Sequence, residues 1–192
     1  MKRGAVVLMV LSLGWATAMA QWTFDKSHSN FLFTVRHMVV SDVTGYFKEF
    51  DVNLTSSKDD FTDATIEATV KTASVNTDNE NRDKDLRSDN FFSADKFPEM
   101  KFKSKKIEKT GDNAYKITGD LTIRDVTKEI TFDATLFGTI ATGRDTRAGW
   151  KATAIVNRFD YGMKWNRMIE TGGLVVGENV LITLNLEFRK PK

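Results

Sequence analysis

The chain consists mainly of stretches in which apolar and polar side chains alternate with a period of two residues. In FLFTVRH, the side chains of Phe31, Phe33, Val35 and His37 share one face, and the residues between them share the other. This period is the spacing of a β-strand with one buried face. About eight such strands are predicted, within residues 31–37, 45–54, 64–71, 99–106, 115–124, 130–136, 150–156 and 180–190.

Each predicted strand has one apolar and one polar face, which is typical of antiparallel sheets rather than of parallel sheets covered on both sides. Turn residues separate the strands in the stretches TGDNAY (110–115), FGTIATGRDTRAGW (137–150) and TGGLVVGEN (171–179). The sequence shows no internal repeat and no low-complexity linker. It therefore predicts a single all-β domain over residues 21–192, folded as an antiparallel barrel or as a sandwich.

One segment, residues 76–98, is highly charged and does not alternate. Thr77 followed by Glu80 fits a capping box, so we expect a short and mostly polar helix over about residues 78–88. Three phenylalanines come directly after it, at positions 91, 92 and 97. A polar helix tethered to three aromatic side chains is expected to cap one opening of a barrel.

Residues 1–20 have the pattern of a secretory signal peptide, with a basic start, an apolar run and an AMA cleavage site after Ala20. A retained N-terminal anchor is the alternative. The chain has 28 Lys and Arg against 26 Asp and Glu, so loss of Lys2 and Arg3 leaves a formally neutral mature chain. This balance argues against nucleic acid as a partner. No later stretch reaches the roughly 20 apolar residues of a membrane span. We expect a soluble, exported protein.

The two histidines, His28 and His37, do not predict a catalytic pair or a metal site. If they lie on one strand, nine residue steps place them about 30 Å apart on opposite faces. A turn near Ser29 would weaken this argument. The chain has no cysteine. The sequence contains no G-x-S-x-G motif and no phosphate-binding P-loop. We therefore expect no catalytic residue, no metal and no cofactor.

Many apolar side chains are left to face inward, including most of the 14 phenylalanines. Eight strands can enclose either a filled interior or a cavity for one small apolar ligand, and the pattern leaves both alternatives open.

Five stretches resemble the YceI-like family of exported lipid-binding proteins. The resemblance covers nearly all of residues 22–188, and its long motifs lie in residues 22–50, 73–104, 119–136, 157–166 and 176–188. It implies an extended, lipocalin-like antiparallel barrel with about eight strands and a short capping helix. It also implies a periplasmic protein that holds a polyisoprenoid or another long-chain lipid in an apolar lumen. Many members are dimers, so a homodimer is an open alternative.

Two positions depart from the family pattern. Asp85 stands where the family usually has histidine, and Asp125 stands where it often has glycine. If that histidine contacts a headgroup in relatives, the resemblance does not determine the choice of headgroup here.

Ligand contacts are expected from inward-facing apolar residues and from polar residues near a mouth. The polar candidates are His37, Arg82, Asp83 and Arg87, whose charged groups could meet a ligand headgroup. Alternatively, Arg82 and Asp83 form an ion pair that fixes the cap. Asp160 and Trp165 are expected to shape the opposite rim. The apolar candidates are Phe31, Phe33, Val35, Phe47, Phe91, Phe92, Phe102, Ile123, Phe132 and Leu184.

These observations favour a soluble periplasmic carrier over two alternatives. Burial of about fifteen methylenes supplies on the order of 12 kcal/mol. Ordering and translational losses remove half or more of that, which leaves roughly micromolar affinity. The alternatives are a structural or stress-response domain with a filled core, and an enzyme that acts on such a lipid.

Overall fold

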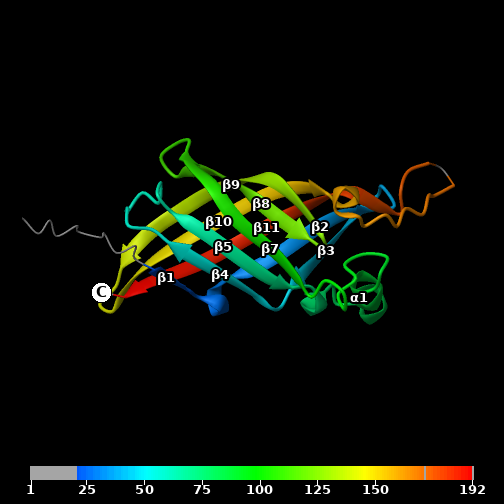
Figure 1. The fold of residues 1–192 in the computed structure, drawn as a ribbon, viewed down its shortest axis with the longest axis horizontal. Coiled ribbons are helices and arrows are strands. Elements are labelled where there is room, and N and C mark those ends of the chain that lie inside the picture. The colour runs from blue at the N-terminus through cyan, green and yellow to red at the C-terminus, as the bar shows by residue number, and fades with distance from the viewer. Residues whose placement is uncertain (1–20, 171, 192) are drawn as a thin grey trace, which may run out of the picture.

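The computed structural model describes residues 21–170 and 172–191, so the expected signal peptide at residues 1–20 lies outside the described part. Antiparallel strands run along the long axis of the molecule, and the one α-helix of these residues lies at one end (Figure 1). The strands are β1 (Gln21–Phe24), β2 (Asn30–His37), β3 (Ser41–Phe47), β4 (Phe50–Thr55), β5 (Thr65–Lys71), β6 (Val75–Asn76), β7 (Glu99–Lys109), β8 (Ala114–Ile123), β9 (Val126–Ala141), β10 (Asp145–Asn157) and β11 (Val176–Pro191).

Eight strands close into a ring in the order β1-β4-β5-β7-β8-β9-β10-β11, because β11 also pairs with β1. The remaining strands continue from β11 in the order β2-β3-β6. This confirms the predicted antiparallel barrel of about eight strands with one short helix. The expected turn over residues 137–150 is wrong in extent, since β9 and β10 pair as far as Ala141 and Thr146. Only residues 142–144 lie outside these strands, because the cross-strand ladder overrides the turn signals of the glycines at the tip.

The predicted strand over residues 45–54 is interrupted, because β3 ends at Phe47 and β4 begins at Phe50. Two 3₁₀ helices make further breaks between neighbouring strands. The first, η1 (Lys26–His28), lies between β1, which pairs with β4, and β2, which pairs with β3. The second, η2 (Thr72–Ser74), lies between β5 and β6. Within the described residues, β6 pairs only with β3, and β7 pairs with β5 and β8.

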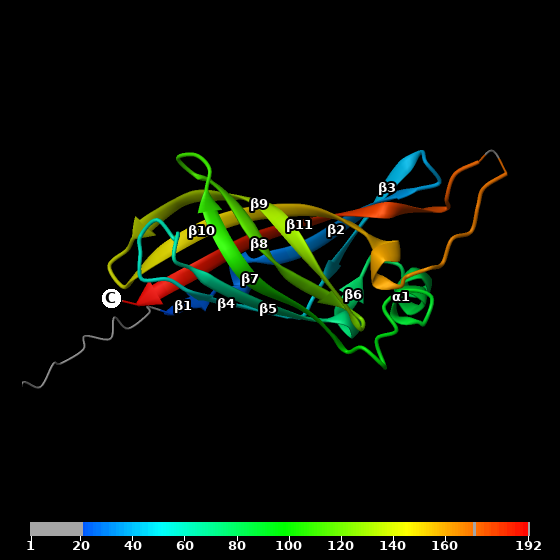
Figure 2. The ribbon, with the colours of Figure 1, turned by 45° about the horizontal axis from the view of Figure 1, so that its top comes forward.

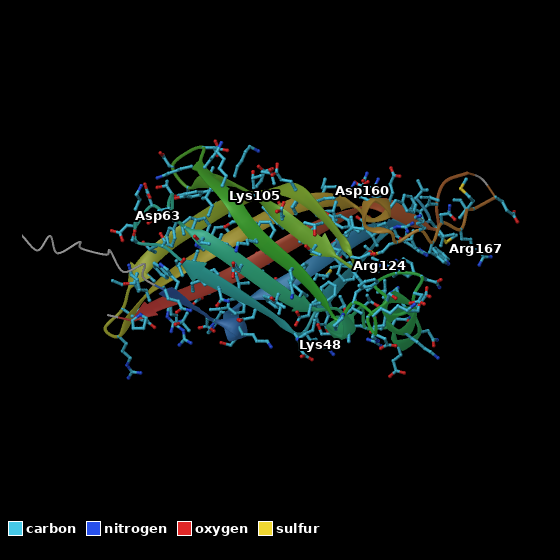
Figure 3. All side chains as sticks on the ribbon, in the orientation of Figure 1. Lys48, Asp63, Lys105, Arg124, Asp160 and Arg167 are labelled. Carbon is cyan, nitrogen blue, oxygen red and sulfur yellow. The ribbon has the colours of Figure 1, made fainter. Side chains whose placement is uncertain are left out.

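The core lies inside the barrel and is formed by the inward faces that the alternation predicts. On β8, for example, Tyr115, Ile117, Leu121 and Ile123 are buried, whereas the intervening side chains are exposed or half-buried. Figure 3 shows many charged side chains around the outside of the barrel, among them Lys105. In residues 21–170 and 172–191, no helix is both long enough and apolar enough to cross a membrane.

Helix α1 (Glu80–Arg87) confirms the predicted short polar helix, although its cap differs. The Asn79 side chain accepts a hydrogen bond from the Arg82 amide and serves as the N-cap. Thr77, the expected cap, instead donates to Asp83 from both its amide and its hydroxyl, at 2.8 and 2.6 Å. An asparagine is as good an N-cap as a threonine, so the local sequence allows both choices.

Candidate functional site

A row of four cavities runs through the barrel, and neighbouring cavities share lining residues. We name them the mouth, upper, central and inner cavities, with volumes of about 100, 70, 90 and 40 Å³. Phe33 and Phe91 line both the mouth and upper cavities, Ile182 lines the upper and central ones, and Ala152 lines the central and inner ones. The row therefore marks a single path along the lumen, divided by side chains rather than by backbone.

The central and inner cavities are lined almost wholly by apolar side chains from nearly all of the strands. In the central cavity the aromatic lining comes from Phe31, Phe50, Phe102 and Phe132, and the Phe102 and Phe132 rings pack edge to face at 5.3 Å. A dry apolar cavity of this kind holds no ordered water but accepts an apolar ligand. The interior is thus partly vacant, as the carrier alternative requires.

The inner cavity ends at a cluster of tightly packed aromatic rings, which we call the closed end. The Phe61 ring lies 5.1 Å from both the Trp22 and Trp150 rings, and Tyr115 lies 5.0 Å from Trp150. The Tyr115 hydroxyl donates to the Asp60 carbonyl oxygen at 3.0 Å. These large side chains fill the barrel cross-section, so a ligand cannot leave the lumen on this side without disrupting the packing.

The polar loop between β4 and β5, which carries Phe61 of the closed end, is held by hydrogen bonds within itself. The Asp63 carboxylate accepts hydrogen bonds from the Ser56 hydroxyl at 2.6 Å and from the Ser57 and Lys58 amides at 3.0 and 3.2 Å. The Ser56 and Ser57 hydroxyl hydrogen bonds hold the pKa of Asp63 far below its ordinary value. Asp63 appears at the end of the barrel opposite α1 in Figure 3.

The other end of the row opens at the mouth cavity, where polar and apolar groups meet. Its lining includes His37 at the end of β2, Arg82 and Asp85 on α1, and Trp165. The Trp165 ring lies 5.8 Å from the Phe91 ring. The expectation that Trp165 forms the opposite rim is therefore wrong, because the chain after β10 returns to the same end as the cap.

The cap is held by hydrogen bonds that converge on Thr77 rather than by a direct ion pair. Arg82 donates to the Thr77 hydroxyl oxygen at 2.8 Å and to the Thr77 carbonyl at 2.9 Å, and the same hydroxyl donates to buried Asp83. Arg87 donates to the Val75 carbonyl of β6 at 3.1 Å. Asp83 and Arg87 line none of the four cavities. Their observed role is to fix the cap.

Arg158 is a buried cavity-lining residue that the sequence did not predict. It is 2% exposed and lines the upper cavity, and its guanidinium donates to the carbonyls of Met163, Trp165, Val176 and Gly177 at 2.7 to 2.9 Å. Burial lowers its pKa from the ordinary value. The residue ties the segment after β10 to the start of β11, and so shapes the mouth. Sequence alternation gives no signal for it, because Arg158 begins the 3₁₀ helix η3 (Arg158–Tyr161).

The two histidines lie at opposite ends of β2, as expected, although η1 rather than the strand carries His28. His28 is exposed and lies 3.2 Å from the Asp25 carboxylate, whereas His37 lines the mouth cavity. Asp25, His28 and Glu187 are close enough to share an ion, but Arg147 lies 2.7 Å from Glu187. Arg189 lies 3.4 Å from Asp25. These arginines already balance the carboxylates.

The predicted apolar contacts all line the cavity row. Phe31, Phe33, Val35, Phe47, Phe91, Phe92 and Ile123 line the upper cavity, and Phe102, Phe132 and Leu184 line the central one. Contact with a ligand stays a prediction for all of them. Lining residues that the reasoning did not single out include Phe50, Leu86, Met100, Met163 and Ile182. Most of these share the inward face of a strand, so the alternation could have found them.

Comparison with known proteins agrees with this architecture. The sequence pattern of the YceI-like domain matches residues 22–188. The "UPF0312 protein SA2479" of Staphylococcus aureus is 37% identical over 172 residues, which cover 88% of this chain and 98% of that protein. The crystal structure of a Campylobacter jejuni YceI protein is 31% identical with a TM-score of 0.67, covering 82% of this chain and 89% of that one.

Two more distant structures share the fold. BcnA of Burkholderia cenocepacia has a TM-score of 0.72 at 20% identity, covering 85% of this chain and 98% of that one. A polyisoprenoid binding domain from Saccharophagus degradans has a TM-score of 0.66 at 14% identity, covering 90% and 99%. Together with the family pattern over residues 22–188, these matches show that the chain belongs to the YceI-like family.

Proposed function

We propose that the protein binds a long-chain amphiphile of the polyisoprenoid or fatty-acid type and carries it through the periplasm. The observation that carries this proposal is the row of apolar cavities with one closed end and one polar mouth. A tail would lie in the upper, central and inner cavities, and a headgroup would stay near His37 and Arg82 at the mouth.

The length of the row suits a long tail. Along β11 the lining residues run from Phe188 at the inner cavity to Val176 at the mouth. Twelve residue steps correspond to about 40 Å along the strand, and somewhat less along the barrel axis because barrel strands are tilted by roughly 40°. The vacant space is divided by flexible side chains such as Met100, which touches the upper and central cavities. We expect these side chains to move apart when a tail enters.

The affinity expected from apolar burial suits a carrier. Burial of about fifteen methylenes supplies on the order of 12 kcal/mol, of which ordering and translational losses remove half or more. The remainder corresponds to roughly micromolar binding, which permits both uptake and release. The Saccharophagus domain, described as polyisoprenoid binding, has the same fold, and this supports the ligand class proposed here.

Binding is proposed rather than catalysis because Arg82, Asp83 and Arg158, around the mouth, are engaged in holding the cap and the neighbouring backbone. Arg82 and Asp83 both hydrogen bond to Thr77, and Arg158 binds four backbone carbonyls. A periplasmic location is part of the proposal, and its support is the secretory pattern of residues 1–20.

Mass spectrometry of the purified protein under native conditions tests the proposal. We expect a co-purifying apolar species, or saturable binding of a fluorescent long-chain fatty acid with at least micromolar affinity. Ala152→Phe fills the junction of the central and inner cavities and should weaken binding at least tenfold. Ile155→Phe on the outer face of the same strand is the matched control. Empty preparations together with no probe binding would favour the filled-core alternative.

A further inference from the structure

We propose that the mouth of the barrel docks on the surface of a phospholipid bilayer through two adjacent hairpins. The first is the β2–β3 turn at residues 38–40, and the second is formed by residues 167–170 and 172–175. We call them the mouth hairpins. This inference rests on the proposed function, since a lipid carrier must exchange its ligand with a membrane. Figure 2 shows both segments projecting beyond the body of the barrel at the end where α1 lies.

The mouth hairpins carry most of the strongly exposed, large apolar side chains at this end of the molecule. Met38 is 43% exposed, Val39 57%, Val40 81% and Met168 64%. Isolated apolar residues on a surface are ordinary, but a group on neighbouring hairpin tips indicates an interaction surface. Transfer of each of these side chains from water into the apolar part of a bilayer interface lowers the free energy.

The two hairpins touch each other and flank the lumen. The Met38 amide donates to the Val175 carbonyl at 2.9 Å, and a Cβ placed on Gly173 would lie 2.9 Å from the Val39 methyl group. His37 directly precedes the first hairpin and Val176 directly follows the second, and both line the mouth cavity. The exposed apolar surface is therefore continuous with the path by which a tail would enter the lumen.

The backbone of the β2–β3 turn is strained, and its sequence does not suit its shape. The Val40 amide donates to the His37 carbonyl at 3.1 Å, which places Met38 and Val39 at the two central positions. Their φ angles are 48° and 67°. This left-handed region favours asparagine and glycine and is especially unfavourable for β-branched valine. The exposed apolar pair at this strained turn indicates a role other than stabilising the fold.

The charges around the mouth hairpins balance, which points to apolar contact rather than to attraction by an anionic surface. Arg36 lies 2.7 Å from Asp42. The second hairpin and its flanks carry Lys164, Arg167, Glu170 and Glu178, and Arg167 is labelled on this projecting segment in Figure 3. Docking should therefore occur on zwitterionic phosphatidylcholine and depend little on salt.

The test is flotation of the purified full-length mature chain with phosphatidylcholine vesicles. Met38→Asn combined with Val39→Gly provides the turn with the residues that its shape favours and removes the apolar tips. We expect this double variant to unfold at a higher temperature than the wild type and to bind vesicles roughly tenfold more weakly. Ile155→Ser removes a 69% exposed apolar side chain from the barrel wall and should leave vesicle binding unchanged.

Loading of a fluorescent long-chain fatty acid from a cyclodextrin complex separates this inference from the proposed function. The double variant should load with the wild-type affinity in solution. If the wild type loads but does not float with vesicles, or if the double variant floats as well as the wild type, docking is overturned and the binding function stands. If light scattering shows that the double variant splits a dimer, the mouth hairpins bind a second copy and docking is also overturned. If the wild type does not load at all, the proposed function itself fails.

Discussion

The two ends of the barrel are built in opposite ways. At the closed end, Phe61, Tyr115 and Trp150 fill the cross-section, and Asp63 holds the β4–β5 loop together. At the mouth, the cross-section is covered by α1, which is held mainly through Thr77 and Arg87. Dense aromatic packing resists opening, whereas a few hydrogen bonds to one short helix can break locally. The difference assigns stability to one end and, under the proposed function, ligand access to the other.

The largest effect on the free energy of unfolding is expected from the loss of an aromatic side chain at the closed end. Trp150→Ala should lower the free energy of unfolding by about 3–5 kcal/mol, because the cavity it leaves cannot collapse between Phe61 and Tyr115. Leu86→Ala at the mouth should cost only about 1–2 kcal/mol, since Leu86 is half-buried and lines space that is already vacant. Urea denaturation of both variants measures the contrast. Equal losses would contradict the proposed division between the two ends.

The second prediction concerns the anchor of the cap. Asp83→Ala leaves the buried Thr77 amide and hydroxyl without their acceptor and should cost about 2 kcal/mol. Asn79→Ala removes only the helix cap and should cost about 1 kcal/mol. Hydrogen exchange should show increased opening of α1 and β6 in the Asp83 variant, with the closed end unaffected. Faster exchange throughout the barrel would show that the two ends are not independent.

The third prediction is a pH dependence that arises near the closed end. The Ser27 hydroxyl hydrogen bond, opposed in part by burial and assisted by His28 and Arg189, lowers the pKa of Asp25 to about 2. An unfolded aspartate has a pKa of about 3.9, so this contribution is complete above that value and is lost as the pH falls toward 2. In Asp25→Asn, the urea midpoint should change less between pH 5 and pH 2 than in the wild type. The same pH slope in both proteins would exclude Asp25 as a source of acid sensitivity.

The smallest effect on stability is expected from a substitution that fills vacant space. Val35→Trp places a larger side chain where the mouth and upper cavities meet. We expect a change of about 1 kcal/mol or less in the free energy of unfolding, together with a loss of ligand binding, because the tail can no longer pass. Calorimetry and a fluorescent fatty acid measure the two quantities. A strong destabilisation would indicate that the upper cavity is too rigid to admit a tail.

The alternation of side chains was sufficient to predict the antiparallel barrel and most of its inward face. The inward direction of Phe33, Leu121 and Ile182 was predictable, because a one-residue shift of register would expose every apolar side chain on their strands. The cap was predictable in outline from the charged segment and its phenylalanines. Its N-cap was not, because Thr77 and Asn79 both satisfy the local rule and only the buried carboxylate of Asp83 decides between them.

The geometry of the mouth was less predictable because it depends on contacts between distant segments. Trp165 follows β10 in sequence and could lie at either end until the chain path back to β11 is known. Arg158 lies where alternation stops, and its four carbonyl partners are divided between the segment after β10 and the first two residues of β11. Reasoning from single strands identifies the wall of the lumen but not the loops that surround its opening.

The isolated position of the short strand β6 has a mechanical consequence. Within residues 21–170 and 172–191, no hydrogen-bonded ladder joins β6 to β7, whereas β5 pairs with β7, so the wall has a gap only at the mouth end, beside α1. The wall can widen at this gap without breaking a row of interstrand hydrogen bonds, while the β5–β7 ladder keeps the rest of the ring closed. Under the proposed function, a bulky or branched tail would pass through this gap.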